Sequence, residues 1–550
     1  MLILLLLLPF LIAKAQPPEE YQLLIKYKQT KDIDIAYRIL KEYPQAVFRD
    51  DLMLMLAKEE TARGKKEEAK RLLLNSNPNN LLDNLKEDYV NLWKGLGLDQ
   101  RTGFLKSPVL FREFIPNVKI NQEEALKASE ELFRKRYYRD AASLLERFDF
   151  QSVCFLLGKS YLFMKDRERS LAVLERCEDQ RAKAELALMQ FDMGNKERVE
   201  NLLLEIKDKE VLYDALFRLG RKSLSTRKPE DAINYLQRIE TSYGREFNLG
   251  IAYYAMGNYS KASEHFLNSV AYSKNAEERS SGYFWAYKSY MNIDREKASE
   301  YLVKASNGSG FYHAVASSML GLPVASKAMK AVMEDENLPK TARLIKAVWN
   351  LGFPEYARLE AFKRIREMSS SDIISLSKFD PYLAVRLAIR KYGYGSFVYS
   401  AVAFPKPYLG LVEKISQKYN IEQALIYAIM RQESLFDPYA VSVANARGLM
   451  QLIDSTAQYM ARREGIRIKN IYDPETNLLL GASYVRYLLD QWKGNLINTL
   501  ASYNAGPSRV KSWQGYEDEH LFIETIPITE TREYVKRVLY NYYVYSELLK

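Results

Sequence analysis

The sequence predicts an all-α protein in which a long helical solenoid precedes a smaller C-terminal domain. Only 24 Gly and 18 Pro stand among 550 residues, against 40 Tyr, a balance that favours packed helices over turn-rich β-structure. A helix-pair pattern also recurs about every 30 residues through the first part of the chain. The composition, 47% apolar and 27% charged, provides a core and excludes both a disordered chain and a membrane protein with many spans.

Residues 1–15 have the pattern of a signal peptide. The apolar run from Met1 to Ala13 is too short to span a bilayer, which needs about 20 residues. Ala13 and Ala15 supply the small residues of a cleavage site, so we expect cleavage after Ala15 and an exported protein without a transmembrane segment. No basic residue precedes the apolar run, which leaves an uncleaved anchor as the alternative. Gln16 stands where a lipid-anchored protein would have Cys.

Residues 16–305 carry the repeat of a tetratricopeptide-like helical solenoid. In the clearest copy, within 249–266, Gly250 and Ala262 allow two helices to approach closely and Phe266 fills the seam between them. The small residue of the second helix recurs at intervals of 29, 29, 33, 30 and 36 residues, at Ala141, Ser170, Val199, Ala232, Ala262 and Ala298. One helix pair cannot bury its apolar face alone, so the copies are expected to stack. The stack then binds a partner or holds another domain in place.

The region after the repeats, residues 306–398, breaks this rhythm. A Ser-Asn-Gly-Ser-Gly loop at 306–310 is followed by short helical stretches, which predict a helical linker domain. Cys154 and Cys177 are expected near the adjoining ends of an antiparallel helix pair, where a disulfide and two buried thiols are both compatible with the sequence. The chain has only three His and no metal-ligand spacing, so no metal site and no cofactor are predicted.

The positive charge of the chain does not indicate a nucleic-acid partner. The formal net charge is +10, of which residues 401–550 contribute +1, from 17 basic and 16 acidic side chains, and residues 1–400 contribute +9. These charges are dispersed instead of forming a basic stripe, so we expect no binding of nucleic acid.

An acidic residue continues an apolar helix face at Glu433. Asn420 is expected to cap a helix that begins at Ile421, with Gln423 as its capping-box partner. The apolar face consists of Leu425, Ile426, Ile429 and Met430. Because Glu is rarely buried alone, two interpretations compete. The carboxyl is either paired with a basic neighbour such as Arg431, or kept protonated by burial for use as a general acid.

Further motifs follow Glu433-Ser434 in a defined order. They are Gly448-Leu-Met-Gln451, Ala501-Ser-Tyr-Asn-Ala-Gly506 and a C-terminal run from Glu524-Thr-Ile-Pro to Tyr534-Val. Together they resemble the soluble lytic transglycosylases, a family of periplasmic enzymes that cut bacterial peptidoglycan. The motifs lie in residues 399–550, and the upstream helices resemble the solenoid and linker of that family.

The resemblance implies a lysozyme-like catalytic domain at 399–550 and a peptidoglycan lytic exotransglycosylase. Glu433 corresponds to the single catalytic Glu of the family. This residue protonates the departing glycosidic oxygen and then accepts the proton of the muramic acid 6-hydroxyl, which leaves a 1,6-anhydro end. The attack is intramolecular, so a second carboxylate is not required. The residues that the resemblance assigns to substrate binding are Ser442, Met450, Gln451, Tyr484, Tyr503, Asn504 and Glu524.

Structural roles compete with several of these assignments. Met450 fits the apolar core, Tyr484 fits helix packing, and Asn504 fits a turn. Glu524 is also placed to pair with Arg532.

The motifs depart from the family pattern at three positions. Asn445 stands where Gly is common, which is compatible with a left-handed backbone because Asn adopts it readily. Ile453 and Asp454 replace a Met and a Pro, and Asp454 is expected to cap the next helix.

Two other functions remain open on the sequence. A lysozyme-like hydrolase would use water and would need a second carboxylate, for which Asp437, Asp454 and Glu524 are candidates. A non-catalytic solenoid scaffold would bind cell-wall enzymes and retain the terminal domain without its activity. Intact Glu433 disfavours the scaffold, and the sequence does not distinguish attack at glycan ends from attack within strands.

Overall fold

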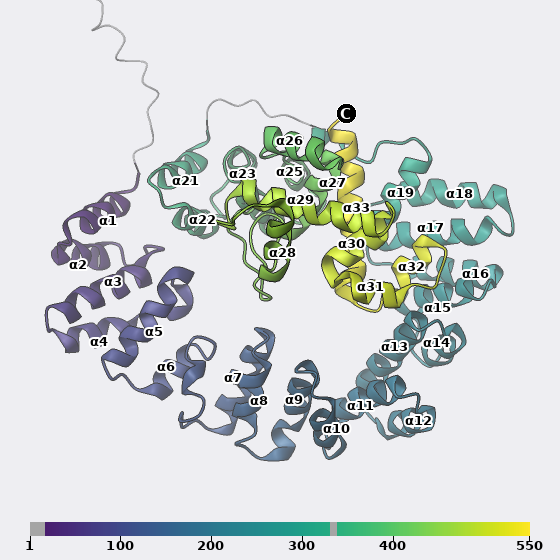
Figure 1. Ribbon diagram of the computed structural model, residues 1–550, viewed down its shortest axis with the longest axis horizontal. Coiled ribbons are helices and arrows are strands. Elements are labelled where there is room, and N and C mark those ends of the chain that lie inside the picture. Colours follow the sequence, from purple (N-terminus) through teal and green to yellow (C-terminus); the bar gives the residue numbers. More distant parts are fainter. Residues whose placement is uncertain (1–16, 331–337) are drawn as a thin grey trace, which may run out of the picture. The chain divides into compact units, whose positions relative to one another are not determined.

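The computed structural model describes residues 17–330 and 338–550 and confirms the all-α class (Figure 1). No β-strand occurs in these two ranges, and Arg447 forms isolated bridges with Val441 and Leu452. Within the same residues, no helix is both long and apolar enough to cross a membrane. The predicted signal peptide, residues 1–15, lies outside the described part of the chain.

The contacts divide the chain into two compact units. The first unit joins the described residues up to Cys177 to those from 338 to Tyr399. Its α-helices are α1 (Glu19–Thr30), α2 (Ile33–Glu42), α3 (Arg49–Ala62), α4 (Lys66–Asn75), α5 (Lys86–Gly95), α6 (Gln100–Lys106), α7 (Gln122–Arg134), α8 (Tyr138–Leu145), α9 (Phe150–Phe163), α10 (Arg167–Glu175), α21 (Lys340–Asn350), α22 (Pro354–Lys363), α23 (Ser370–Leu376) and α24 (Pro381–Tyr392). Short 3-10 turns are η1 (Pro78–Asn80), η2 (Asp83–Leu85) and η3 (Arg112–Phe114).

The second unit joins the described residues from Glu178 to 330 to those from Ser400 to Lys550. Its first set of helices is α11 (Gln180–Asp192), α12 (Lys196–Glu205), α13 (Lys209–Ser225), α14 (Pro229–Leu236), α15 (Tyr243–Ala255), α16 (Tyr259–Ala271), α17 (Ala276–Tyr290), α18 (Arg295–Ser306), α19 (Gly310–Met319) and α20 (Lys327–Lys330). Its second set is α26 (Leu409–Tyr419), α27 (Gln423–Ser434), α28 (Asp454–Glu464), α29 (Pro474–Gln491), α30 (Leu496–Ala505), α31 (Pro507–Trp513), α32 (Glu519–Thr525) and α33 (Thr529–Leu548). Helix α25 (Phe397–Val402) lies where the two units join in sequence.

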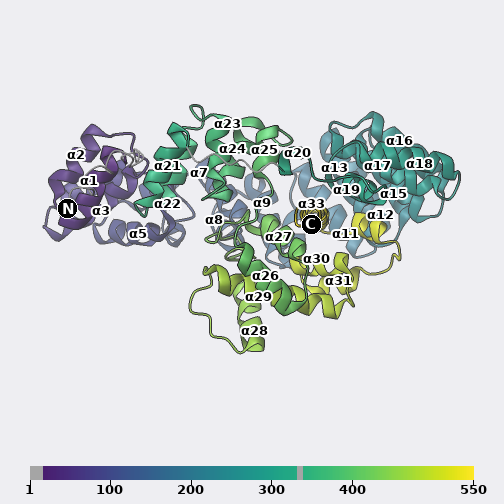
Figure 2. The ribbon, with the colours of Figure 1, turned by 90° about the horizontal axis from the view of Figure 1, so that it is seen from above.

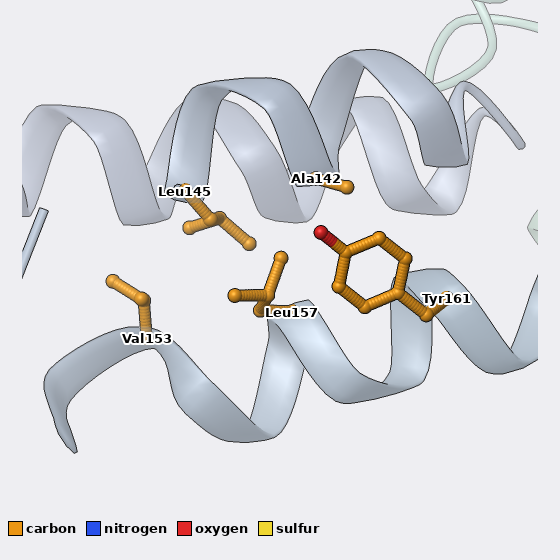
Figure 3. Packing of buried hydrophobic residues seen from close by; sticks show 5 residues of the cluster. All are labelled: Ala142, Leu145, Val153, Leu157 and Tyr161. Carbon is orange, nitrogen blue, oxygen red and sulfur yellow. The ribbon is translucent and has the colours of Figure 1, made fainter. Parts of the chain in front are cut away.

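Successive helices of the repeat region pack as antiparallel pairs with apolar seams. In one seam, between α8 and α9, side chains from both helices interdigitate (Figure 3). The residues of this cluster are Ala142, Leu145, Val153, Leu157 and Tyr161. In the next seam, a Cβ on Gly158 would lie 2.5 Å from Leu174 Cδ2, so a larger residue would force the buried Leu174 side chain to shift.

The helix pair α15 and α16 confirms the packing predicted at its glycine. A Cβ on Gly250 would lie 2.6 Å from the ring of Phe266, while Ala262 is fully buried. The close approach that the sequence indicated is therefore present, and the aromatic ring occupies the space that a larger side chain would need.

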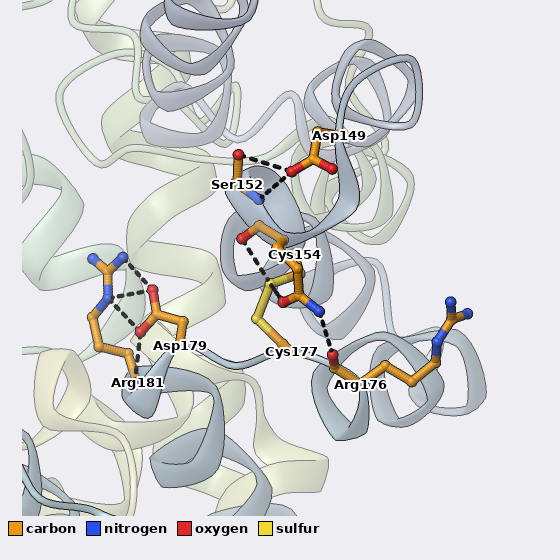
Figure 4. Close-up of a disulfide and its surroundings, with 8 residues drawn as sticks. Asp149, Ser152, Cys154, Arg176, Cys177, Asp179 and Arg181 are labelled. Atoms are coloured by element: carbon orange, nitrogen blue, oxygen red, sulfur yellow. Dashed lines mark hydrogen bonds and ion pairs between the residues drawn. A yellow bond between two sulfur atoms is a disulfide. The ribbon is translucent and has the colours of Figure 1, made fainter.

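Cys154 and Cys177 form a disulfide, which settles the choice that the sequence left open (Figure 4). Cys154 lies in the first turns of α9, and Cys177 follows the end of α10. The start of α9 is fixed by Asp149, whose carboxylate accepts a hydrogen bond from Ser152 N. The crosslink thus ties together the two open ends of one antiparallel pair.

Part of the predicted linker packs against the first helices of the chain. Tyr21 Oη donates to Glu360 Oε1 at 3.3 Å, and the rings of Phe48 and Tyr356 lie 5.6 Å apart between centroids. Helix α19, at the start of the predicted linker, instead packs with α17, α18 and α33. The domain boundaries at residues 305 and 398 stay predictions.

The helix that carries Glu433 begins later than predicted. Asn420 does not cap it, because Asn420 has φ 49° and ends α26 in the left-handed conformation. Helix α27 begins at Gln423 after Glu422, which makes no side-chain cap. The prediction was wrong because Asn suits both a helix start and a left-handed helix end.

Candidate active site

Glu433 lies in the last turn of α27, at the end of a buried apolar face. The chain then reverses sharply, because Leu435 and Phe436 have φ 49° and 69°. Ser434 Oγ accepts a hydrogen bond from Phe436 N at 3.1 Å and holds this reversal. Two consecutive left-handed residues other than glycine are strained, and such strain persists only where the surroundings impose it. The reversal therefore fixes where α27 ends and where Glu433 stands.

Tyr534 binds the Glu433 carboxyl from α33. Its hydroxyl donates to Glu433 Oε1 at 2.7 Å across 101 residues of sequence. Figures 1 and 2 show α33 beside α27 and α30, with which it is in contact. Glu433 is half-buried, and removal of water raises its pKa to about 8. The Tyr534 hydrogen bond opposes this rise and the charge of Glu530 adds to it, so the carboxyl is mainly protonated at neutral pH.

The sequence left open an ion pair between Arg431 and Glu433. In the structure, the side chain of Arg431 makes hydrogen bonds to other groups. Its Nε donates to Ala403 O at 2.6 Å and its Nη1 to Asn541 Oδ1 at 3.0 Å. The guanidinium also lies over the ring of Phe404, 4.3 Å from its centroid. The hydrogen-bond partner of Glu433 is instead the neutral hydroxyl of Tyr534, which is compatible with a protonated carboxyl.

The loop between α27 and α28 contains three predicted binding residues, and two of them, Ser442 and Gln451, also hold the loop together. Ser442 Oγ accepts from Ala446 N at 3.0 Å. Gln451 Nε2 donates to the carbonyls of Ala440 and Gly448, each at 3.0 Å. Both side chains remain partly exposed. These bonds fix the two side chains in place beside the end of α27.

The backbone of this loop also explains one departure from the family pattern. Asn445 has φ 62°, so Asn serves where the family often has Gly, as the sequence indicated. Asp454 is the first residue of α28 instead of its cap, and its Oδ1 accepts from Arg447 Nη1 at 3.2 Å. The prediction that Asp454 caps α28 was therefore wrong, and its carboxylate instead forms an ion pair with Arg447.

Asn477 anchors the Gly-Leu-Met-Gln loop and was not singled out from the sequence. It is fully buried on α29, accepts from Met450 N at 2.7 Å and donates to Arg447 O at 3.0 Å. A Cβ on Gly448 would lie 2.2 Å from its Nδ2, so this glycine is required. Helix α29 begins with the polar run Pro474-Glu-Thr-Asn477, which gives no sign of this role in the sequence. The side chain of Met450 is fully buried against Gly481 and belongs to the core below the site.

Tyrosines from α29 and α30 lie next to the carboxyl. Tyr503 Oη donates to Met450 O at 2.7 Å, and its ring centroid lies 5.3 Å from that of Tyr484. Burial, followed by the Glu433 charge, raises the pKa of Tyr503, which places it close to the acid. Asn504 Oδ1 accepts from Thr531 Oγ1 at 2.6 Å, so it links α30 to α33.

Glu524 makes its contacts elsewhere. Its carboxylate accepts from Tyr312 Oη of α19 at 2.6 Å and pairs with Lys536 Nζ at 2.7 Å. Only 2% of the residue is exposed. Although burial alone would raise it, the pKa of Glu524 is lowered by Lys536 and Arg532. The structure thus places Glu524 at the contact of α32 and α33 with the repeat helices.

The acidic neighbours of Glu433 differ from those considered in the sequence. Asp454 is paired with Arg447, and Asp437 accepts from Tyr439 N at 3.2 Å. Glu530, at the start of α33, is the acid whose charge raises the pKa of Glu433. It is exposed, and no sequence pattern distinguished it from other surface acids.

Comparison with known proteins assigns the same region to a family. Residues 410–526 match the family model described as the transglycosylase SLT domain. Over 288 residues the chain is 31% identical to the soluble lytic murein transglycosylase of Escherichia coli K12, which covers 48% of this chain and 43% of that protein. A putative soluble lytic murein transglycosylase of Haemophilus influenzae is 37% identical over 153 residues, 26% of each chain. The chain thus spans less than half the length of these relatives.

Solved structures match the fold over nearly the whole chain. The 70-kDa soluble lytic transglycosylase of Escherichia coli gives a TM-score of 0.65 at 19% identity, over 96% of this chain and 92% of that one. An inactive glutamate-to-glutamine mutant of the lytic transglycosylase Slt of Pseudomonas aeruginosa gives 0.61 at 19% identity, with the same coverage. Fold and site thus define a helical repeat protein with a transglycosylase SLT domain. Residues 410–526 match that domain family, and over about half of its length the chain is similar to soluble lytic murein transglycosylases.

Proposed function

We propose that this protein is an exported, periplasmic lytic transglycosylase that cleaves the β-1,4 bond between N-acetylmuramic acid and N-acetylglucosamine. The observation that carries the proposal is Glu433, a carboxyl held protonated by its surroundings at the end of α27, just before a strained chain reversal. The match of residues 410–526 to the transglycosylase SLT domain supports the substrate, and the predicted signal peptide supports the compartment.

In the first step Glu433 acts as general acid. The carboxyl donates its proton to the glycosidic oxygen as the bond from that oxygen to C1 of the muramic acid breaks. A pKa near 8 suits this step, because the acid is protonated at neutral pH and still able to release its proton. Tyr534 stabilises the carboxylate that results, since its hydroxyl already donates to Oε1.

In the second step the Glu433 carboxylate accepts the proton of the muramic acid 6-hydroxyl. That oxygen forms the new bond to C1, which closes the 1,6-anhydro ring and returns the carboxyl to its protonated form. Nucleophile and electrophile belong to one sugar, so proximity replaces an activated water. No step requires a metal or a cofactor.

Polar side chains around the carboxyl supply contacts for the glycan. We assign sugar binding to Ser442, Gln451, Tyr484 and Tyr503, which are partly exposed in the loop after α27 and on α29 and α30. Asn504 supports these contacts by joining α30 to α33. Met450 and Glu524 are left out, because their side chains are buried among other partners. The repeat helices provide further surface for cell-wall enzymes as partners.

The substitution Glu433→Gln tests the acid. Gln keeps the size and can accept the Tyr534 hydrogen bond but cannot donate a proton to the leaving oxygen. We expect kcat on purified peptidoglycan to fall at least ~10³-fold, with glycan binding retained. Glu422→Gln, at the other end of α27, is the matched control and should stay near parental activity. Activity of the Glu433 variant within tenfold of the parent would refute the assignment.

The products distinguish transglycosylation from hydrolysis. Mass spectrometry of digested peptidoglycan should show glycan fragments that end in non-reducible 1,6-anhydro sugars. Reducing ends would mean that water is the nucleophile, and Glu530 would then become the candidate second carboxylate.

A further inference from the structure

Helix α33 carries the hydrogen-bond partner of Glu433 on one face and a largely buried cation on the other. Tyr534 Oη donates to Glu433 Oε1 of α27 at 2.7 Å. Two residues later, Lys536 Nζ lies 2.7 Å from Glu524 Oε1. Residues two apart on a helix point about 200° apart, so these two side chains leave α33 on opposite sides. Helix α33 contacts α27 and α30 as well as α19 of the repeat helices (Figure 1).

A buried carboxylate connects Lys536 to the repeat helices. Tyr312 of α19 donates its hydroxyl to Glu524 Oε1 at 2.6 Å, the same oxygen that Lys536 approaches. The Lys536 ammonium also lies over the Tyr312 ring, 5.7 Å from its centroid. Tyr312 is 1% exposed and Glu524 is 2% exposed. These three residues, Tyr312, Glu524 and Lys536, form a closed and buried set of contacts, which we call the α33 clamp.

The repeat helices also hold the main chain of the same glutamate. Arg221 of α13 donates from Nη2 to the Glu524 main-chain oxygen at 2.6 Å. Two repeat helices, α13 and α19, thus contact both the backbone and the carboxylate of one residue of α32. All of these elements belong to the second unit.

The α33 clamp fixes the position of α33 more than it stabilises the fold. The attraction between a buried carboxylate and a buried ammonium is largely offset by the free energy needed to remove both from water. A buried charge that loses one of its donors is, however, strongly destabilised. The Glu524 oxygen therefore tolerates only those positions of α33 in which Lys536 and Tyr312 both stay within reach.

We infer that Tyr312, a residue of the repeat helices, is a positioning residue for the general acid Glu433. It acts through the α33 clamp on α33, whose position sets how well Tyr534 reaches the carboxyl. The repeat helices therefore contribute to catalysis in addition to any role in binding. The use of Glu433 as an acid rests on the proposed function, while the effect of the clamp on the carboxyl stands without it.

The charges of the clamp do not act on Glu433 directly. The titratable groups that face the Glu433 carboxyl are Tyr534 and Glu530 of α33 and Tyr503 of α30. Burial raises the pKa of Tyr312 well above its ordinary value, so its hydroxyl stays neutral. An effect of Tyr312 on Glu433 must therefore pass through the position of α33. A separate set of titratable groups faces Glu524, namely Tyr312, Lys536, Arg532, Arg221, His520 and Tyr243.

The substitution Tyr312→Phe tests the inference, because it removes one hydroxyl from the clamp and keeps the ring. A weaker bond from Tyr534 should raise the pKa of Glu433 by about half a unit, which is a ~3-fold change in its proton affinity. Nuclear magnetic resonance titration of ¹³C-labelled carboxyls measures this, with Glu433→Gln to assign the signal. On soluble glycan fragments, kcat at pH 7 should fall at least ~3-fold at unchanged KM, since Tyr534 stabilises the carboxylate formed in the reaction.

The matched control is Tyr254→Phe. Tyr254 Oη also donates from a repeat helix to the SLT domain, but its acceptor is Asp518, at 3.1 Å, at the start of α32 instead of on α33. The control should lower the thermal unfolding temperature as Tyr312→Phe does, and leave the pKa of Glu433 and kcat unchanged. Equal changes of pKa and kcat in both variants would overturn the specific role of Tyr312.

Two further variants identify the route. Lys536→Gln breaks the ion pair from α33 itself and should give the same two changes, so the inference is testable even if Tyr312→Phe fails to fold. In a Tyr534→Phe background, Tyr312→Phe should no longer change the pKa of Glu433. The same change in both backgrounds, or none in the parent, would overturn the inference. The titration needs no substrate, so failure of the wild type to cleave peptidoglycan would refute the proposed function alone.

Discussion

Glu433 shows how a single carboxyl is prepared for proton transfer by what surrounds it. Its α27 neighbours are apolar and buried, its hydrogen-bond donor is a neutral hydroxyl, and the nearest charge that acts on it is another acid, Glu530. Each of these except the hydrogen bond disfavours the charged form. The same carboxyl beside a guanidinium would be ionised at neutral pH and unable to donate a proton.

The first prediction at this scale concerns pH. The folded-state pKa of Glu433 is about 8 and the protonated form is the active acid. We therefore expect kcat/KM on soluble glycan fragments to be limited on the alkaline side, with a decline of about tenfold per pH unit above pH 8. A pH profile from 5 to 10 measures this. A decline that begins below pH 6 would mean that the carboxyl is already ionised in the working enzyme.

The hydroxyl of Tyr534 sets where that decline begins. It stabilises the carboxylate, so Tyr534→Phe should raise the pKa of Glu433 and move the alkaline limb to higher pH, by about one unit. Tyr542→Phe is the matched control, because Tyr542 donates at 2.9 Å to Glu422 from the same helix. The control should leave the limb in place, and an equal shift in both variants would point to a general loosening of α33.

At the residue scale the sequence identified Glu433, and the structure explains why it stands out. It also indicated the left-handed backbone at Asn445. The partner of Glu433, Tyr534, was not recognised as such, because a bond across 101 residues leaves no local pattern. Asn477 was missed for the same reason. The contacts of Glu524 with Tyr312 depend on how α32 docks on the repeat helices, which no residue spacing encodes.

At the scale of elements, each helix pair of the repeat depends on how closely its two helices approach. Gly250→Ala would place a Cβ 2.6 Å from the buried ring of Phe266 and should destabilise the protein by about 1–3 kcal/mol. Gly95→Ala, at the end of α5, has open space around the new Cβ and should be neutral or slightly stabilising. Thermal unfolding followed by circular dichroism compares the two. Equal effects would show that helix propensity, not contact, governs these positions.

The disulfide of the α9–α10 pair closes a loop with a sequence separation of 23 residues. The double variant Cys154→Ser and Cys177→Ser should lose about 3 kcal/mol of stability. Urea unfolding with and without reductant measures this loss. Reductant should destabilise the parent and leave the double variant unchanged, while a parent insensitive to reductant would show that the bond contributes nothing.

Periodicity predicted the helix pairs well, since the seam of a pair lies within about 30 residues of sequence. The start of α27 was predicted less well. Asn420 ends one helix and Glu422 precedes the next, and both junctions fall within three residues. With so short a connection, Asn420 can either end α26 or cap α27. The two assignments differ in the sign of the φ angle of Asn420, which the residue type does not determine.

At the scale of the whole molecule, residues 178–330 and the SLT domain share one compact unit. The contact between these two segments depends on Asp518. Its carboxylate accepts hydrogen bonds from Tyr254 Oη at 3.1 Å and from Lys288 Nζ at 2.6 Å. Asp518 also caps α32. Long-range contacts of this kind were outside what local patterns predict, so the predicted linker at 306–398 gave no sign that its first helix packs against α33.

The substitution Asp518→Asn separates the charge from the cap. Asn caps helices as well as Asp does, but the largely buried Lys288 would lose its anionic partner. We expect a loss of about 1–3 kcal/mol and faster proteolysis near α32, measured by thermal unfolding and limited digestion. Asp490→Asn, whose partner is a surface arginine, should change stability by less than about 0.5 kcal/mol. Equal resistance to protease in both variants would contradict this role.

The left-handed pair Leu435 and Phe436 has a consequence for any attempt to make this protein sturdier. Glycine at position 435 would relieve about 1 kcal/mol of backbone strain, and a search for stability alone would select it. The same substitution would make the backbone that follows Glu433 more flexible. The Glu433 carboxyl would then sample positions out of reach of its substrate. Thermal stability and kcat therefore make opposite demands on residue 435. Selection for stability should favour Gly at this position, and selection for activity should keep Leu.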